Sequence, residues 1–467
     1  MNFSAGQRLG LVKKEIILDK VSPETELAPA VLLQKELLEE ALRLGASDIH
    51  IEPLEKAVQV RYRVDGCLRK GPLFPRPVLE SLVSRYKISC NLDISEKRVP
   101  QDGSFRVQVH GKAVDLRTSF IPTQWGEKLV VRLLDPQQNF LGLEQLGIPP
   151  GQLERLGTMI ERPQGLILVV GPTGSGKTTT LYSILQTIHR EGINIITVED
   201  PIEYSLAGVN QVQVNEKVGL TFANSLRSIL RQDPDVILVG EIRDEETAQI
   251  ALRAAFTGHL VLSTLHTNDA VSTLTRLQNL GLEPYVLSSS LLGILSQRLI
   301  RRNCPVCSKT KTPDPKLLER YNLGISFGDF FYQGEGCPDC RGEGTNGREG
   351  VYELLTITPA LREAILRKAP ETEMRYLAVQ EGMETLLNCG LKKAGAGLVS
   401  LEEMMRVIPY ETGARFCPSC LHPLEHFYVC CPSCSRELIR QCSDCGKHLQ
   451  DSWRSCPYCG KKTSRKT

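Results

Sequence analysis

The sequence predicts an α/β fold in which helices cover a parallel sheet, with a small α+β domain before it and cysteine-rich modules after it. Two observations lead to this prediction. Four short apolar runs, "GLILVVG", "INIITVED", "DVILVGE" and "GHLVLSTLH", are separated by helix-length segments between residues 165 and 266, and such runs are typical of strands buried on both faces. Twelve of the 16 cysteines fall in six CxxC pairs, which is the spacing of metal ligands.

The region before these runs predicts a small α+β domain. Apolar residues at helical spacing predict a first helix over 28–44. Two stretches of alternating apolar and polar residues follow, and each is broken by a hairpin signal, Asp65-Gly66 in one and His110-Gly111 in the other. With the apolar strand "KLVVRLLD" they complete a domain over 28–138, behind an extension of residues 1–27.

A phosphate-binding loop follows the first apolar run. "GPTGSGKT", residues 171–178, matches the pattern GxxxxGK[ST] and opens a probable helix. In such a loop the backbone N–H groups wrap the phosphates, the lysine reaches the β and γ phosphates, and the final hydroxyl binds Mg²⁺. An accidental glycine turn would lack the strand before it and the helix after it. We therefore expect ATP and Mg²⁺ at this loop, held by Gly171, Pro172, Thr173, Gly174, Ser175, Gly176, Lys177, Thr178 and Thr179.

Two further apolar runs end in acidic residues. "IITVEDPIE" offers Glu199, Asp200 and Glu203, and "DVILVGEIRD" offers Glu241. An acid at a strand tip beside a phosphate loop is the natural candidate to activate the attacking water. Either cluster, taken alone, would more often be a solvated loop.

Two histidines, His259 and His266, flank the fourth apolar run. Isolated histidines are usually satisfied core or surface residues. A sensor of the γ-phosphate is the alternative interpretation.

In this order, the motifs resemble those of the secretion ATPase superfamily, the motors of type II secretion and type IV pilus assembly. The resemblance covers about Leu37 to Val407. It rests on the phosphate loop together with "GASDIHIEP", "VRYRVDG", "KRVPQDGSFRV", "DLRTSFIPTQWGEKLVVRLLD", "VEDPIEY", "LRSILRQDPDVILVGEIRD" and "TGHLVLSTLHTNDA".

The resemblance implies a RecA-like ATPase domain over 139–303 behind a PAS-like N-terminal domain. It makes Glu241 the catalytic carboxylate, Glu199 the acid of the Asp box, and both histidines sensors of the nucleotide state. It also implies that Arg117 in "DLRTSF" and Arg132 in "VVRLLD" reach the phosphates from the smaller domain. The alternative for both arginines is an ion pair on the strand surface.

The resemblance further implies a homo-hexameric ring that moves a platform protein of the inner membrane. Many such motors carry an additional N-terminal domain, whereas about thirty residues precede the first matched helix here, so docking to the membrane is expected to differ. Two other functions compete with this one: a nucleic-acid translocase of the RecA-like class that uses zinc ribbons to hold DNA, and a non-catalytic scaffold.

The first four cysteines of the CxxC pairs predict a structural zinc site. Cys304, Cys307, Cys337 and Cys340 supply four thiolates, which suit tetrahedral Zn²⁺ and leave no open position for chemistry. The insertion is expected over 304–349, before a helical region over 350–409. By the resemblance, this element is common in assembly motors and absent from pilus-retraction motors. A nucleic-acid finger is disfavoured because the loop between the pairs has no basic face.

The last cysteines repeat at a fixed offset. Cys417, Cys420, Cys431 and Cys434 are followed 25 residues later by Cys442, Cys445, Cys456 and Cys459. This pattern resembles a double zinc ribbon over 417–467, after a linker of residues 410–416. Each copy is too short to build a core, so Zn²⁺ is expected to supply its folding free energy. A protein partner is the favoured role for this tail. Its excess of basic residues suits a phosphate or membrane surface, although a solvated chain end is the simpler explanation of that excess.

Composition narrows the class of protein. Fifty-six basic and 54 acidic residues leave a net charge of +2, and nucleic-acid binding is therefore disfavoured. No segment resembles a signal peptide or reaches the roughly 18 apolar residues of a membrane-spanning helix. We expect a cytoplasmic protein that reaches the membrane through its partners.

Overall fold

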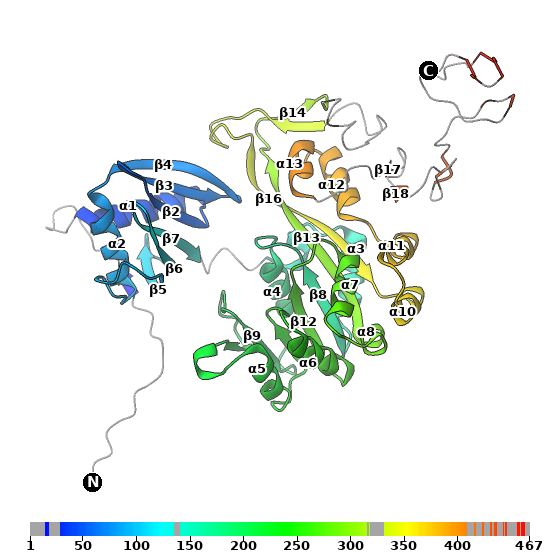
Figure 1. Cartoon of the computed structure of the whole chain (residues 1–467), viewed down its shortest axis with the longest axis horizontal. Helices are drawn as coiled ribbons and strands as arrows, with labels where there is room; N and C mark the ends of the chain where they lie inside the picture. Colours follow the sequence, from blue (N-terminus) through cyan, green and yellow to red (C-terminus); the bar gives the residue numbers. More distant parts are fainter. Residues whose placement is uncertain are drawn as a thin grey trace, which may run out of the picture. The chain divides into compact units, whose positions relative to one another are not determined.

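The structure is a computed structural model. It describes residues 15–17, 29–134, 141–314, 317 and 331–408, and short stretches of the cysteine-rich tail between residues 415 and 462. The chain divides into two compact units (Figure 1). The first contains Met1–Phe140 and Glu203–Leu206, and the second contains Leu141–Ile202 and Ala207–Thr467.

The first unit is built on a sheet whose described strands follow the order β1-β5-β6-β7-β2-β3-β4. All neighbours are antiparallel except β1 and β5. The strands are β1 (Glu15–Ile17), β2 (Asp48–Pro53), β3 (Ala57–Val64), β4 (Cys67–Pro75), β5 (Gln101–Val109), β6 (Lys112–Thr123) and β7 (Gly126–Leu134). Helices α1 (Pro29–Leu44) and α2 (Val78–Ser89) share one hydrophobic core with the sheet.

Both predicted hairpins are confirmed. Asp65 and Gly66 join β3 to β4, and His110 and Gly111 join β5 to β6, with positive φ at all four residues. Two positive φ values at the centre of a two-residue turn match the right-handed twist of the strands. Along β3, buried residues alternate with half-buried ones, as the sequence pattern predicts.

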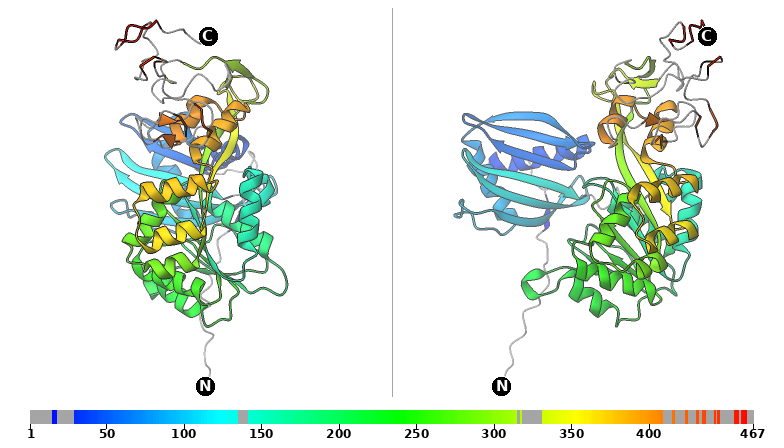
Figure 2. Two further views of the ribbon diagram at one scale, coloured as in Figure 1. Left: turned by 90° about the vertical axis from the view of Figure 1, so that its right-hand side faces the viewer. Right: turned by 45° about the vertical axis from the view of Figure 1, so that its right-hand side comes forward.

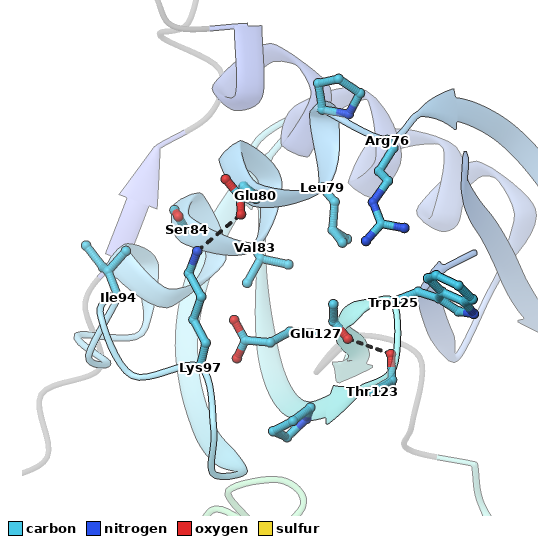
Figure 3. A pocket seen from close by; sticks show the side chains of 13 residues that line it. Arg76, Leu79, Glu80, Val83, Ser84, Ile94, Lys97, Thr123, Trp125 and Glu127 are labelled. Carbon is cyan, nitrogen blue, oxygen red and sulfur yellow. Dashed lines mark hydrogen bonds and ion pairs between the residues drawn. The ribbon is translucent and has the colours of Figure 1, made fainter. Parts of the chain in front are cut away.

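A cavity of about 460 Å³ lies between α2 and the β6–β7 turn (Figure 3). Leu79, Val83 and Trp125 contribute apolar walls, and Glu127 lines it as well. Lys87 Nζ lies 2.7 Å from a carboxylate oxygen of Glu127, and these side chains are only 1% and 6% exposed. Arg76, Glu80 and Lys97 line the cavity too, so the first unit contains a buried ion pair beside a cavity of mixed polarity.

The second unit is a predominantly parallel sheet in the order β10-β9-β11-β12-β8-β13-β16. Only the pairing of β13 with β16 is antiparallel. The strands are β8 (Gly165–Val170), β9 (Ile195–Glu199), β10 (Asn210–Gln213), β11 (Val236–Val239), β12 (Leu260–Leu265), β13 (Leu291–Asn303) and β16 (Thr345–Thr356). The four predicted strands are confirmed as β8, β9, β11 and β12, and every residue in them is buried.

Helices cover both faces of this sheet. One group shares a hydrophobic core with it: α5 (Phe222–Ile229), α6 (Glu245–Phe256), α7 (Ala270–Asn279), α8 (Pro284–Ser290), α10 (Pro359–Leu366) and α11 (Glu371–Gln380). In Figure 2 (left) the sheet lies between the gold helices α10 and α11 and the cyan helices α3 (Pro150–Ile160) and α4 (Lys177–Ile188). Short 3₁₀ helices occupy Leu143–Leu146 and Glu216–Val218.

Strands β13 and β16 extend beyond the rest of the sheet. β13 pairs with β8 only through Leu291–Ser296, whereas its pairing with β16 continues to Asn303. We call the outer part, Gln297–Asn303 with its β16 partners, the β13–β16 arm. Cys304 follows the arm directly. The prediction of a helical region over 350–409 is therefore wrong at its start, because residues 350–356 complete β16 and belong to the sheet of the second unit.

The arm carries the remaining elements of this unit. β14 (Ser308–Lys311) pairs with β15 (Phe331–Gly334) beside the first cysteine cluster. Helices α12 (Leu386–Gly395) and α13 (Leu401–Val407) pack on the arm around Ile300 and Val351. In the tail, β17 (Arg415–Phe416) pairs with β18 (Pro423–Leu424). Among the residues that the structure describes, no helix has the length and hydropathy of a membrane span.

Candidate active site

The phosphate loop joins the end of β8 to the start of α4. Its backbone requires glycine at both ends. Gly171 has φ of 148°, and a Cβ there would lie 2.6 Å from the carbonyl oxygen of Gln297. Gly176 caps α4 with φ of 91°. Side chains are therefore excluded where the backbone would approach a phosphate.

Lys177 folds back onto this loop. Its Nζ donates hydrogen bonds to the carbonyl oxygens of Gly171 at 2.9 Å and Pro172 at 3.2 Å. Burial lowers the pKa of Lys177 to about 8, with Glu241 opposing the shift and Arg298 adding to it. The ammonium group is therefore poorly neutralised and would gain from an anionic ligand.

The loop also fits a bound nucleotide. The Ser175 hydroxyl is buried and has no hydrogen-bond partner among the residues that the structure describes. Buried polar groups normally have a partner, and a bound phosphate would supply one here. Together with the N-terminus of α4, which favours anions, these residues suit the phosphates of ATP. Thr178 stands at the first turn of α4, where its hydroxyl would hold Mg²⁺.

Glu241 lies just beyond the end of β11, at the same edge of the sheet as the phosphate loop. Parallel strands end at one edge, and this edge is where α/β folds bind their ligands. One carboxylate oxygen accepts a 2.5 Å hydrogen bond from Arg243 Nη2. The other lies 3.5 Å from His266 Nε2. The same Arg243 nitrogen lies 3.5 Å from a carboxylate oxygen of Asp200.

Glu199 ends β9 and is only 4% exposed. Its two oxygens accept hydrogen bonds from Tyr182 at 2.5 Å, Thr197 at 2.6 Å and Gln211 at 3.1 Å. Tyr182 lies on α4, so Glu199 fastens the end of β9 to the helix that follows the phosphate loop. With both oxygens occupied, Glu199 acts here as an anchor of the loop's helix.

The two predicted histidines lie at opposite ends of β12. His266 follows the strand and lies beside Glu241. His259 precedes the strand, and its Nδ1 lies 3.0 Å from the carbonyl oxygen of Ala254. Six strand residues separate the two histidines, which is roughly 20 Å. They cannot both face one phosphate in this unit: His266 lies at the end of the sheet that carries Glu241 and the phosphate loop, and His259 lies at the opposite end of β12.

Arg117 and Arg132 are cross-strand neighbours in the first unit. Arg117 on β6 pairs in register with Arg132 on β7, which pairs with Asp48 on β2. Like charges directly opposite each other repel. Asp48 lies 2.9 Å from Arg132, and Glu203 lies 3.1 Å from Arg117. Both arginines form ion pairs in this structure, as the alternative interpretation expects, and both are at least a quarter exposed.

Sequence reasoning missed two residues behind the phosphate loop, Gln297 and Arg298 on β13. Gln297 donates a 2.7 Å hydrogen bond to the carbonyl of Ser175 and accepts one of 2.9 Å from the Thr180 hydroxyl. Arg298 donates to the carbonyl of Asn268, in the loop after His266. The signal that would have found them is a Gln-Arg pair inside the apolar run "LLGILSQRLI".

The predicted structural zinc site is brought together. The Sγ atoms of Cys304, Cys307, Cys337 and Cys340 lie within 4.8 Å of one another. Three of their separations are 3.7–3.8 Å. A tetrahedron of thiolates around Zn²⁺ at 2.3 Å has edges of about 3.8 Å. Backbone N–H groups of Gly336 and Gly344 point at two of the sulfurs, so the residues fit Zn²⁺.

The second tail module also gathers its ligands. Sγ atoms of Cys442 and Cys459 lie 3.5 Å apart, and those of Cys445 and Cys456 lie 3.6 Å apart. Of the first module's ligands, Cys417 and Cys420 lie outside the described residues, whereas Cys431 and Cys434 are described.

The two copies share a turn. The amide of Cys431 donates to the carbonyl of Arg436, and the amide of Cys456 donates to the carbonyl of Lys461, with positive φ at Ser435 and Gly460. These pairs are each 25 residues apart. The repeat therefore extends to the backbone.

Comparison with protein families supports this description. The family described as "Type II/IV secretion system protein" matches residues 23–406. The family described as "Double zinc ribbon" matches residues 410–460.

Two characterised relatives illustrate the similarity. Type II secretion system protein E of Pectobacterium carotovorum subsp. carotovorum is 50% identical over 385 residues, which cover 82% of this chain and 76% of the relative. Type IV pilus assembly ATPase PilB of Thermus thermophilus is 47% identical over 398 residues, 84% of this chain and 44% of the relative.

Solved structures agree on the fold. The pilus retraction motor PilT with bound ADP matches with a TM-score of 0.55 at 32% identity, over 80% of this chain and 96% of that one. The ATPase DotB of Legionella pneumophila matches with a TM-score of 0.60 over 84% of this chain and 99% of that one, and at 22% identity it shows the fold alone.

The relatives are proteins of secretion and pilus assembly, so the alternative of a nucleic-acid translocase is not supported. Phosphate loop, strand-end carboxylate and family membership all agree on ATP hydrolysis. The chain is therefore an ATPase that belongs to the type II/IV secretion system protein family.

Proposed function

We propose that this chain is a homo-hexameric motor that hydrolyses ATP to move a membrane platform protein, and so powers pilus assembly or type II secretion. The observation that carries the proposal is the grouping of Glu241, His266 and Lys177 at one edge of the sheet. Relatives of this chain are named for both machines. The motor would work in the cytoplasm, at the inner face of the membrane, through its partners.

In this proposal each residue at the loop has one task. Lys177 leaves the loop carbonyls to which it donates and pairs with the β and γ phosphates. Bound Mg²⁺ supplies neutralisation of phosphate charge, and Thr178 would hold it. Glu241 accepts a proton from the attacking water. His266, beside Glu241, contacts the terminal phosphate and distinguishes ATP from ADP.

The arginines of the first unit are proposed to complete the site. Arg117 and Arg132 stand side by side in register, with Arg63 next to Asp48 in the same cross-strand row. Arg132 and Arg63 lie 2.9 Å and 3.8 Å from the buried carboxylate of Asp48, so two guanidinium groups share one carboxylate. Arginine stabilises phosphate oxygens by paired hydrogen bonds. We infer that Arg117 exchanges Glu203 for phosphate when nucleotide binds.

Zinc is proposed to be structural in all three Cys₄ sets, since four thiolates leave no open coordination position. The site of Cys304 is expected to stabilise the end of the β13–β16 arm. The double zinc ribbon is expected to bind a protein partner rather than nucleic acid.

The first test is hydrolysis by the purified chain. Glu241→Gln and Lys177→Ala are expected to lose ATPase activity while thermal unfolding is unchanged. Glu246→Gln is the matched control, because Glu246 is an exposed acid on α6 that pairs with Arg227. Normal hydrolysis by Glu241→Gln would refute the assignment of the base.

The second test separates the two machines in cells that carry Glu241→Gln at the native locus. Pili are counted by electron microscopy, and exported proteins are assayed in parallel. Loss of pili with normal export identifies a pilus assembly motor. Normal pili with trapped substrates identify a secretion motor, and no change in either would contradict both assignments.

A further inference from the structure

Arg243 contacts the carboxylate of Glu241, which must be free to accept a proton in the proposed reaction. Its Nη2 lies 2.5 Å from one oxygen of Glu241, and this contact is the main cause of the raised pKa of Arg243. A general base must offer a lone pair to the proton that it accepts. A guanidinium at this distance occupies a lone pair of that oxygen and fixes the orientation of the carboxylate.

A second acceptor lies within reach of the same nitrogen. Arg243 Nη2 is 3.5 Å from Asp200, which follows the end of β9 and is more exposed than Glu241. The two acceptor distances differ by only 1 Å. The guanidinium also lies over the ring of Phe222, with its Cζ 5.9 Å from the ring centre. Because the two acceptors are so close to one nitrogen, a small rotation of the guanidinium is enough to exchange Glu241 for Asp200.

Among the described residues, the carboxylates in direct contact with Arg243 are those of Glu241 and Asp200. Glu216 acts on Arg243 only at longer range. His266 and Lys177 face Glu241 rather than Asp200. Arg243 can therefore pair with either of two carboxylates, Glu241 or Asp200, which follow the neighbouring strands β11 and β9.

We propose that Arg243 is a positioning residue that holds Glu241 in a resting state, and that Asp200 accepts Arg243 when nucleotide binds. Glu241 is then free to take a proton from water. This inference rests on the proposed role of Glu241 as the base. It assigns Asp200 a task that neither binds nucleotide nor transfers a proton.

The exchange predicts coupling between the two residues. Asp200→Asn weakens the alternative acceptor, so Arg243 stays on Glu241. We expect kcat to fall by about 10- to 100-fold, the worth of one charge-assisted hydrogen bond, while the Kd for an ATP analogue stays within about two-fold. In an Arg243→Gln background the same Asp200→Asn change should have no further effect, because no guanidinium remains to be released. Arg243→Lys should restore the dependence on Asp200.

Glu216→Gln is the matched control, since it removes an anion near Arg243 that is not an acceptor, and its kcat should match wild type. Equal losses from Asp200→Asn in both backgrounds, or a Kd that weakens as much as kcat, would overturn the proposal. Should Arg243→Gln be inactive, a crystal structure with a non-hydrolysable ATP analogue decides: Arg243 on Asp200 supports the exchange, and Arg243 still on Glu241 refutes it.

The experiments distinguish a wrong role for Glu241 from a wrong exchange of Arg243. If Glu241→Gln hydrolyses ATP normally, Glu241 is not the base. If Glu241→Gln is inactive but Asp200→Asn matches wild type, only the exchange is wrong.

Discussion

Gln297 supports the phosphate loop from behind, and its replacement should weaken nucleotide binding. In Gln297→Met the carbonyl of Ser175 loses its 2.7 Å donor and the Thr180 hydroxyl loses its 2.9 Å acceptor. Thr180 can turn to the carbonyl one helical turn earlier, so Ser175 bears most of the loss. A buried carbonyl without a partner costs about 1–3 kcal/mol.

The loss should appear in binding rather than in folding. A free loop can relax until water reaches the Ser175 carbonyl, whereas a bound nucleotide requires the ordered loop. A difference of about 1–3 kcal/mol corresponds to about a 5- to 150-fold weaker Kd. At saturating ATP, kcat should be nearly unchanged, because Glu241 keeps its place.

Titration with a fluorescent nucleotide measures this effect directly. Ser296→Ala is the control. Ser296 precedes Gln297 on β13, so it points to the other face of the sheet, and its buried hydroxyl has no hydrogen-bond partner in the described part of the chain. Removing that hydroxyl should leave Kd unchanged. Wild-type affinity in Gln297→Met, or an equal loss in Ser296→Ala, would refute the reasoning.

Three other predictions concern charge and metal. Burial lowers the pKa of Lys177 to about 8, so the free enzyme loses this charge above that pH and binding of nucleotide must restore it. The affinity for nucleotide should therefore be full below about pH 8 and fall above it. Calorimetry in buffers of different ionisation enthalpy should show proton uptake on binding at about pH 9 and none at about pH 7. Lys87→Met leaves Glu127 buried without its partner and should lower the free energy of unfolding by about 3–5 kcal/mol, whereas Lys87→Met combined with Glu127→Leu should recover most of that loss. Denaturation followed by Trp125 fluorescence measures both variants, and equal stability of the two would contradict the prediction. Twelve paired cysteines predict three zinc ions per chain, and Cys304→Ser should lower the measured metal content by one; an unchanged content would mean that this cluster binds no zinc.

The parts of the fold that the sequence predicted are those encoded by short patterns. Buried parallel strands are continuous apolar runs, and hairpins carry turn residues with positive φ, so β8, β9, β11, β12 and the first-unit hairpins were predictable. β13 was not, because Gln297 and Arg298 interrupt its apolar run. Their partners come from elements far apart in the sequence: Ser175 in the phosphate loop and Thr180 on α4 for Gln297, and Asn268 after β12 for Arg298. Local sequence patterns do not contain such contacts.

The residues of the candidate active site also fall into those that local motifs predict and those that depend on the folded structure. The motif predicted Lys177 and the strand-end position of Glu241, since each follows from local spacing. It could not predict that Glu199 would be buried under three donors, or that His259 would stand at the far edge of the sheet. Those properties depend on strand direction and on residues from other elements.

The β13–β16 arm has a mechanical consequence. Its outer seven residues of β13, Gln297–Asn303, span roughly 23 Å at the rise of a strand. Pairing with β16 stiffens them in regular register up to Arg301, beyond which the register shifts. The Cys304 cluster lies at the outer end of this arm, and Gln297 lies at its inner end, where it contacts the phosphate loop. A force applied to the cysteine cluster therefore loads the nucleotide site through one continuous strand, with no loop in between to absorb it.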